Sequence, residues 1–138
     1  FLVISGHADE EQMVALRLAA HYVIRRHRGD NERRKVRIMV CADYDFAYQL
    51  RGKYFDEKDG HGGTIETSRV MAIRPDLIRG KGRKSFQKLP KFEIVANPKD
   101  FFPEGIIGDP KEASAEKGRF INNFIINEIV KLIEELRR

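Results

Sequence analysis

Two short apolar runs with a helical pattern between them limit the fold of this chain more than any other feature. Residues 1–5 form an apolar run that ends at Gly6, which is typical of a buried strand. Residues 35–42 form a second apolar run. Between the runs, after Asp9 as the helix N-cap, apolar residues recur at spacings of three and four. A strand–helix–strand order predicts two parallel strands joined by a right-handed crossover, and hence an α/β fold with a mostly parallel sheet.

The rest of the sequence predicts fewer elements than such a fold usually contains. Residues 43–58 are either a loop or a short helix, and a helix over 65–74 has Thr64 as its N-cap. A short strand over 92–96 and a long helix from about residue 112 to the end complete the pattern. About three strands and three helices make a thin core for an α/β domain. We therefore expect part of the sheet, on the N-terminal side, to be missing from this sequence.

The first residue supports the same expectation. The chain opens with Phe1 rather than Met, and it does so inside an apolar run. We therefore expect a processed, split or truncated chain, in which residues 1–138 form the C-terminal part of a single domain.

Composition predicts a globular protein of the cytoplasm. Apolar residues make up 41% of the chain and charged residues 34%, which favours a packed core under a highly charged surface. There is no apolar run long enough to span a bilayer, so no membrane partner is expected, and there is no signal-peptide pattern. The single cysteine, Cys41, lies in an apolar run, which indicates a buried, reduced thiol. The net charge of +5 favours anionic ligands, either phosphorylated metabolites or nucleic acid.

Two histidines lie where a metal site could form. His7 follows the first predicted strand, at the sheet edge where open α/β proteins bind ligands, and Asp9 is close to it in sequence. His61 lies in a glycine-rich turn, and Glu66 follows in the first turn of the next predicted helix. Imidazole and carboxylate groups are the usual ligands of catalytic zinc, iron or manganese. The structural alternative is that His7 caps a helix and Glu66 interacts with a helix dipole.

Three segments together resemble the creatininase (creatinine amidohydrolase) family. They match, in order, the family's Asn-Gly-His segment after a strand, its His-Ala-Gly-x-x-Glu-Thr-Ser segment, and its Gly-Asp-Pro to Glu-Lys-Gly segment at the last helix. Here they read Ser5-Gly6-His7-Ala8, then His61-Gly62-Gly63-Thr64-Ile65-Glu66-Thr67-Ser68, then Gly108-Asp109-Pro110 with Glu116-Lys117-Gly118. Each segment is short, but they occur in the family's order over most of the chain.

The resemblance implies a three-layer αβα sandwich with a centre of one or two divalent ions (Fe, Zn or Mn), in a ring-like homo-oligomer. His7 and Glu66 match metal ligands of the family, and Asp9 stands where creatininase itself has a metal-binding glutamate. His61 matches a histidine that handles the substrate or a proton, so it is the expected catalytic residue. The expected substrate contacts are the three residues after it, Gly62, Gly63 and Thr64.

Two departures from the family pattern bear on these expectations. Ser5 replaces the usual Asn, and Ala8, Asp9 and Glu10 replace the common Gly-Gly-Asn, which indicates a divergent branch. The family's N-terminal segment supplies three further metal ligands, and it has no counterpart in this sequence. The chain therefore carries only part of the expected site.

From the resemblance we expect a metal-dependent hydrolase that cleaves a non-peptide C–N bond in an amide or formamide. The favoured substrate is a phosphorylated formylamino-pyrimidine ribotide, which an archaeal branch of the family deformylates on the route to riboflavin and deazaflavin. The basic loop over 79–84 and a thermophile-like composition suit that substrate. The alternative is a creatinine-like cyclic amide, although creatininase recognises its substrate through tryptophan and this chain has none.

Two other hypotheses remain open. The basic clusters and tyrosines could bind nucleic acid, although no recognised reader motif is present and acids nearly balance the bases. Alternatively, the chain is a fragment without activity, in which His7 and Glu66 are relics of a lost site.

Overall fold

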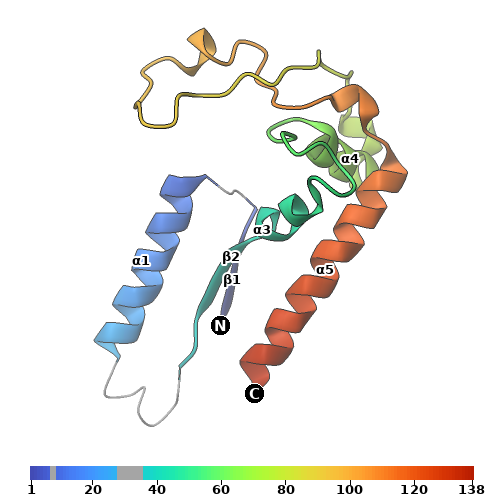
Figure 1. Ribbon diagram of the computed structural model, residues 1–138. Coiled ribbons are helices and arrows are strands. Elements are labelled where there is room, and N and C mark those ends of the chain that lie inside the picture. Colours follow the sequence, from blue (N-terminus) through green and yellow to red (C-terminus); the bar gives the residue numbers. More distant parts are fainter. Residues whose placement is uncertain (7–8, 28–35) are drawn as a thin grey trace. The chain divides into compact units, whose positions relative to one another are not determined.

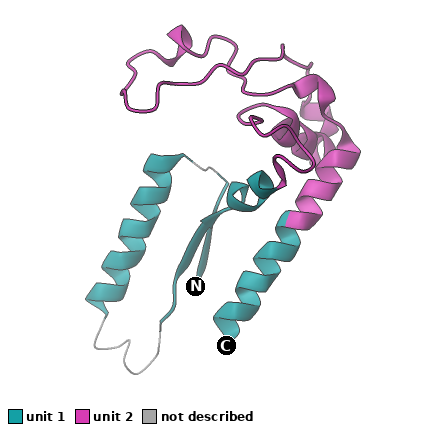
Figure 2. Ribbon diagram, in the orientation of Figure 1, with its two compact units in different colours: residues 1–49, 125–138 teal, residues 50–124 magenta. Residues whose placement is uncertain are grey.

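The computed structural model of the protein describes residues 1–6, 9–27 and 36–138 (Figure 1). The chain divides into two compact units, which are residues 1–49 with 125–138 (unit 1) and residues 50–124 (unit 2) (Figure 2). The long C-terminal helix contributes residues to both units. In the described part of the chain, no helix combines the length and apolar character that a bilayer crossing requires.

Unit 1 contains the strand–helix–strand order that opens the sequence. Strand β1 (Leu2–Ser5) pairs in parallel with strand β2 (Met39–Ala42), with Leu2 opposite Met39. Helix α1 (Glu10–Arg26) lies between the two strands in the sequence. The predicted α/β class with a parallel sheet is confirmed, with both strands shorter than the apolar runs that predicted them.

Helix α1 begins and packs as its sequence predicts. The Asp9 carboxylate accepts a hydrogen bond from the Gln12 N–H at 2.7 Å, which satisfies one of the free amides of the first turn. Met13 is buried, and Leu16 and Ile24 on the same face are half-buried. Because this stripe is narrow, most of the helix surface remains exposed.

The sheet of unit 1 has helical segments on both sides. Figure 1 shows the two strands between α1 and the C-terminal half of α5 (Ala115–Arg137). The guanidinium of Arg37, just before β2, donates a hydrogen bond to the Glu135 carbonyl at 2.8 Å. Unit 1 thus shows the helix–sheet–helix layering of an αβα sandwich. After β2, the chain forms a short helix, α3 (Tyr44–Ala47), rather than a loop.

Unit 2 is built around α4 (Thr64–Ile73) and the first turns of α5. Helix α4 ends at Ile73 with Arg74 as its C-cap, because Pro75 follows and restricts the residue before it. The two helices approach closely where Gly118 faces Ser68. A side chain at Gly118 would overlap the Ser68 carbonyl and crowd the Ala72 methyl group, so only glycine fits at this crossing.

Two sequence predictions for unit 2 are wrong. Residues 92–96 form no strand, and Phe92 and Ile94 are 93% and 97% exposed, because no strand in the described residues pairs with this segment. The last helix begins at Ala115 rather than near residue 112. Residues 110–112 form a 3₁₀ turn, and the Ser114 hydroxyl then caps the helix by accepting a hydrogen bond from the Lys117 N–H at 3.1 Å.

Candidate active site

The glycine-rich segment before α4 forms a tight loop that ends directly in the helix. Gly62 has a φ of +61°, a left-handed conformation that residues with a side chain rarely adopt. The N-cap position of α4 is Gly63, which has no side chain to cap with, so Thr64 is the first residue of the helix rather than its N-cap as predicted. The amides of the first turn therefore need a partner from elsewhere.

Asp59 supplies that partner from five residues before the helix. Its two carboxylate oxygens accept hydrogen bonds from the Thr64 N–H at 2.7 Å and the Ile65 N–H at 2.9 Å. The Asp59 side chain is only 1% exposed, and burial raises its pKa above 3.8, although the two amides and the positive charge of Arg51 oppose this shift. Sequence reasoning assigned no role to this residue.

Two glycines make room for the Asp59 carboxylate. A side chain at Gly63 or at Gly108 would overlap an Asp59 carboxylate oxygen, and Gly108 also has a φ of +135°. Gly63 and Gly108 lie 45 residues apart in the sequence, in the second and third of the family-like segments. The buried carboxylate thus explains why both segments need glycine at these positions.

Glu66 lies in the first turn of α4 and turns back onto the glycine loop. Its carboxylate accepts a hydrogen bond from the Gly62 N–H at 2.7 Å, and the side chain is 21% exposed. The His61 imidazole, which is 66% exposed, has its Nδ1 3.8 Å from the same Glu66 oxygen. The His61 ring also lies 6.0 Å from the Phe102 ring. One imidazole and one carboxylate therefore meet at the surface of unit 2.

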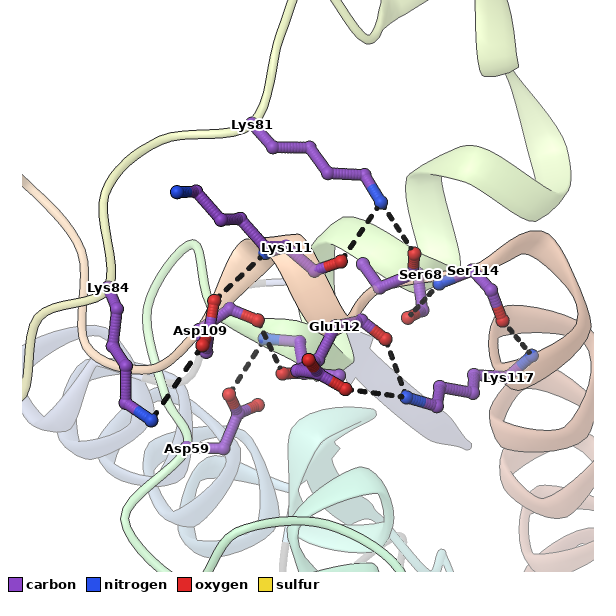
Figure 3. Close-up of polar contacts among 11 residues, drawn as sticks. Asp59, Ser68, Lys81, Lys84, Asp109, Lys111, Glu112, Ser114 and Lys117 are labelled. Atoms are coloured by element: carbon purple, nitrogen blue, oxygen red, sulfur yellow. Dashed lines mark hydrogen bonds and ion pairs between the residues drawn. The ribbon is translucent and has the colours of Figure 1, made fainter.

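The segment around Asp109 joins the start of α4 to the basic loop (Figure 3). The Asp109 carbonyl accepts a hydrogen bond from the Thr64 hydroxyl at 2.7 Å, and its carboxylate lies 3.7 Å from the Lys84 ammonium. Lys81 donates to the carbonyls of Lys111 and Ala113. Two lysines of the basic loop are thus engaged in holding the segment that precedes α5.

The start of α5 is fixed by a second group of polar contacts (Figure 3). The Lys117 ammonium donates to the Glu112 carbonyl at 2.5 Å and lies 3.9 Å from the Glu112 carboxylate. The Ser114 N–H donates to the Ser68 hydroxyl at 3.2 Å, which ties this start to α4. Asp109 and Lys117, from the third family-like segment, therefore hold the loop and the start of α5 beside α4.

An open hollow of about 270 Å³ lies beside these contacts in unit 2. The Thr64 and Lys84 side chains border it, together with three aromatic and four charged residues, Tyr54, Phe55, Phe86, Asp56, Asp109, Glu112 and Lys117. Its two lysines face three carboxylates, so the hollow has no excess of positive charge. Neither Glu66 nor His61 lines it.

The predicted site residues fall into three groups. His61, Gly62, Gly63, Thr64 and Glu66 all lie on one loop and helix start, in unit 2. Asp9 lies in unit 1, where its carboxylate caps α1. His7 lies outside the described residues. Of the predicted substrate contacts, Gly62 is half-buried whereas Gly63 and Thr64 are buried, so their contact with a substrate stays a prediction.

The described residues fit part of a divalent metal site. Within residues 1–6, 9–27 and 36–138, no three His, Cys, Asp or Glu side chains gather in a metal-binding cluster. The Glu66 carboxylate is nevertheless a donor of the kind that zinc, manganese and iron accept, and the His61 imidazole lies beside it. The carboxylate is thus of the right chemical type, and further ligands are needed to complete a site.

Comparison with protein families decides the relationship. The family model described as "Creatininase: Creatinine amidohydrolase" matches residues 1–133. The chain belongs to the creatininase family. Among curated protein sequences, none matches significantly.

Solved creatininase structures share this fold. A structure described as "Creatininase Mn" has 23% sequence identity and a TM-score of 0.77, covering 97% of this chain and 55% of that chain. A creatinine amidohydrolase (creatininase) crystal structure has 22% identity and a TM-score of 0.76, with 97% and 54% coverage. A mutant creatininase of the "Zn-Zn type" has 22% identity and a TM-score of 0.74, with 97% and 55% coverage. The chain thus has the creatininase fold and spans little more than half the length of these relatives.

Proposed function

We propose that this chain carries part of the active site of a metal-dependent hydrolase that cleaves an amide-type C–N bond. The observation that supports it most directly is the His61 and Glu66 pair, whose Nδ1 and Oε2 atoms lie 3.8 Å apart on the loop that matches the family's Glu-Thr-Ser segment. Membership of the creatininase family and the manganese and zinc in the related structures also support a divalent cofactor. That the whole protein has this hydrolase activity is part of the same proposal.

In this proposal Glu66 is a metal ligand and His61 moves a proton. When bound, a divalent cation would lower the pKa of a coordinated water to about 7 and would polarise the substrate carbonyl. The His61 imidazole is exposed to solvent and would donate a proton to the leaving nitrogen. Glu66 is held in place by the Gly62 N–H, which fixes its orientation before any ion binds. His7 and Asp9 remain proposed further ligands.

Metal binding tests the proposal. We expect the purified protein to bind Mn²⁺, and Glu66→Gln to weaken the affinity by more than about tenfold, because a ligand carboxylate is lost. Glu93→Gln, which neutralises an exposed carboxylate of the same unit, is the matched control and should bind as the wild type does. Isothermal titration and metal analysis measure both. Absence of bound metal from the wild type, or equal affinity in Glu66→Gln, would refute the proposed role of Glu66.

As substrate we propose the phosphorylated formylamino-pyrimidine ribotide rather than creatinine. The loop over 79–84 supports an anionic substrate, since Arg79 and Arg83 are exposed and have no ion-pair partner in the described chain. Lys81 and Lys84 of the same loop already have partners. Related solved structures include a mutant creatininase complexed with creatine, at 22% identity, a TM-score of 0.73 and coverage of 97% and 55%. Cyclic-amide hydrolysis is therefore the alternative.

Substrate assays separate the two alternatives. The metal-loaded protein should release formate from the ribotide and no creatine from creatinine. Arg79→Ala with Arg83→Ala should raise KM for the phosphorylated ribotide by about tenfold, the usual effect of losing a charged hydrogen bond, and should leave KM for the dephosphorylated compound unchanged. Creatine formation without formate release would reverse the choice of substrate.

The location and assembly of the protein are also proposals. We propose a cytoplasmic protein that forms a homo-oligomer. Sedimentation of the purified protein at micromolar concentration tests the assembly, and a monomer there would contradict it.

A further inference from the structure

Asp59 stands out in unit 2 because it is a buried charge with no part in the chemistry proposed above. Its side chain is 1% exposed, whereas His61 and Glu66, two and seven residues further on, reach the surface. Burying a carboxylate is unfavourable unless hydrogen bonds or opposite charge compensate. Here the Thr64 and Ile65 amides and the nearby Arg51 guanidinium offset part of that cost, although burial still raises the pKa of Asp59.

The position of the Asp59 contacts links it to the candidate site. The two amides that it binds belong to the first two residues of α4, and Glu66 is the third. Glu66 in turn binds the Gly62 N–H, which lies in the loop between Asp59 and the helix. Two carboxylates therefore hold the loop closed. The buried Asp59 binds amides at the start of the helix, and Glu66, in the helix, binds an amide of the loop.

We propose that Asp59 is a positioning residue, which sets the place of Glu66 and His61 by fixing the first turn of α4 against the glycine loop. The inference rests on the proposed function of Glu66 and His61. Gly63 and Gly108 leave the space that the Asp59 carboxylate occupies, because a side chain at either position would overlap that carboxylate. The Gly63 N–H also donates to the Gly60 carbonyl at 3.0 Å, which closes the loop around the carboxylate.

Hydrogen exchange separates a positioning role from simple helix capping. In Asp59→Asn the side-chain amide cannot accept both hydrogen bonds, so the Thr64 and Ile65 N–H groups should exchange faster in either case. A positioning role also predicts that the Gly62 N–H, which binds Glu66 and not Asp59, exchanges about tenfold faster or more. Unchanged exchange at Gly62, with faster exchange at Thr64 and Ile65, would overturn the inference.

Two further variants keep this test decisive. Gly63→Ala retains the charge of Asp59 but displaces its carboxylate, and it should give the same exchange pattern at Gly62. Asp56→Asn, an exposed carboxylate three residues from Asp59, is the control and should leave the Gly62 amide protected. Amides of α1 in unit 1 should exchange at the wild-type rate in all variants, which would show that unit 1 of each variant remains folded.

A separate experiment measures Mn²⁺ affinity, kcat and KM of the same variant. Asp59→Asn should weaken Mn²⁺ binding about tenfold and lower kcat more than it raises KM, because the groups that it places act in the reaction rather than on substrate affinity. If the wild type binds no Mn²⁺, the proposed function fails while the exchange result still decides what Asp59 does. If exchange at Gly62 rises but Mn²⁺ binds the variant as tightly as the wild type, the positioning role fails and the proposed function stands.

Discussion

An aspartate carboxylate caps the N-terminus of both α1 and α4, but the two aspartates lie at different distances from their helices in the sequence. Helix α1 is capped by Asp9, the residue directly before it, which is only half-buried. Helix α4 has glycine at that position and is capped by Asp59 from five residues away, inside the protein. The first cap is a local feature of sequence, whereas the second exists only because the loop and the segment around Gly108 fold around it.

The two caps illustrate a difference in the contacts that stabilise unit 1 and unit 2. In unit 1 the cap, the apolar stripe and the two short strands are each visible as a local pattern in the sequence. In unit 2 segments far apart in sequence are joined by polar groups and by glycines that permit close approach. A structure built on buried polar contacts tolerates few substitutions, because each lost partner leaves another group unsatisfied. The candidate active site lies in this second kind of structure.

The largest effect should come from removing the buried cap. Asp59→Ala leaves the Thr64 and Ile65 amides without a partner and empties the space beside two glycines. Losing a buried charged acceptor should destabilise the protein by about 3 kcal/mol. Urea unfolding of both proteins measures the difference. A loss below about 1 kcal/mol, the size expected of an exposed cap, would remove the contrast between α1 and α4.

The same cap should respond to pH in a defined direction. Because burial raises the folded-state pKa of Asp59 above the ordinary 3.8, its contribution to stability is complete below that pH and is lost as the pH rises through the folded-state pKa. Asp59→Asn does not titrate at this position. The stability advantage of wild type over Asp59→Asn should therefore shrink between about pH 4 and neutrality. Denaturation series at several pH values measure it, and an advantage that grows with pH would show that the amides and Arg51 outweigh burial.

Close packing of α4 and α5 gives the next largest effect. Gly118→Ala places a methyl group against the Ser68 carbonyl, so the helices must separate, at a cost of about 2 kcal/mol. In an exposed helix the same substitution would stabilise by about 1 kcal/mol, so the sign of the change is decisive. Gly80→Ala is the control, because nothing lies within 4 Å of its Cβ position and the change should be nearly neutral. Stabilisation by Gly118→Ala would mean that the two helices do not touch there.

The same contrast explains which parts could be predicted from the sequence. The parallel strands, the α1 cap and the C-terminal end of α4 follow from apolar spacing, Asp9 and Pro75, all of which act over a few residues. The start of α5 was predicted three residues early, because the 3₁₀ turn after Asp109 and the Ser114 cap were not recognised. The predicted strand over 92–96 failed because an apolar run forms a strand only beside a partner.

The candidate site also contains residues whose place could be predicted from the sequence and one whose role could not. The 3.8 Å contact between His61 and Glu66 is a finding of the structure, but their places in the glycine-rich turn and in the first turn of α4 could be predicted. The role of Asp59 could not, because no short-range pattern shows that a carboxylate five residues before a helix is buried. The one signal was indirect: Gly63 stands where a helix N-cap usually has a polar side chain, so the cap had to come from another residue.

The half-buried cap of α1 should contribute less than the fully buried cap of α4. Asp9→Ala removes one hydrogen bond to the Gln12 N–H and should cost about 1 kcal/mol, because water can replace the lost acceptor. Thermal or urea unfolding measures the change, and Asp9→Ser should recover most of it, because serine also caps well. A cost equal to that of Asp59→Ala would show that Asp9 has partners beyond the helix.

The smallest expected effect tests whether α1 depends on local contacts alone. The Gln12 side-chain amide donates to the Ser5 hydroxyl at 2.8 Å, which links the helix to the end of β1. In a double-mutant cycle, Ser5→Ala and Gln12→Ala should show a coupling of about 0.5 kcal/mol, which is typical of a partly exposed neutral hydrogen bond. Pairing Gln12→Ala with Ser114→Ala, whose hydroxyl caps α5 in unit 2, gives a cycle that should show no coupling. A coupling between Ser5 and Gln12 above about 1.5 kcal/mol would mean that even α1 is anchored by contacts its own sequence does not reveal, and that the two helix starts differ in degree rather than in kind.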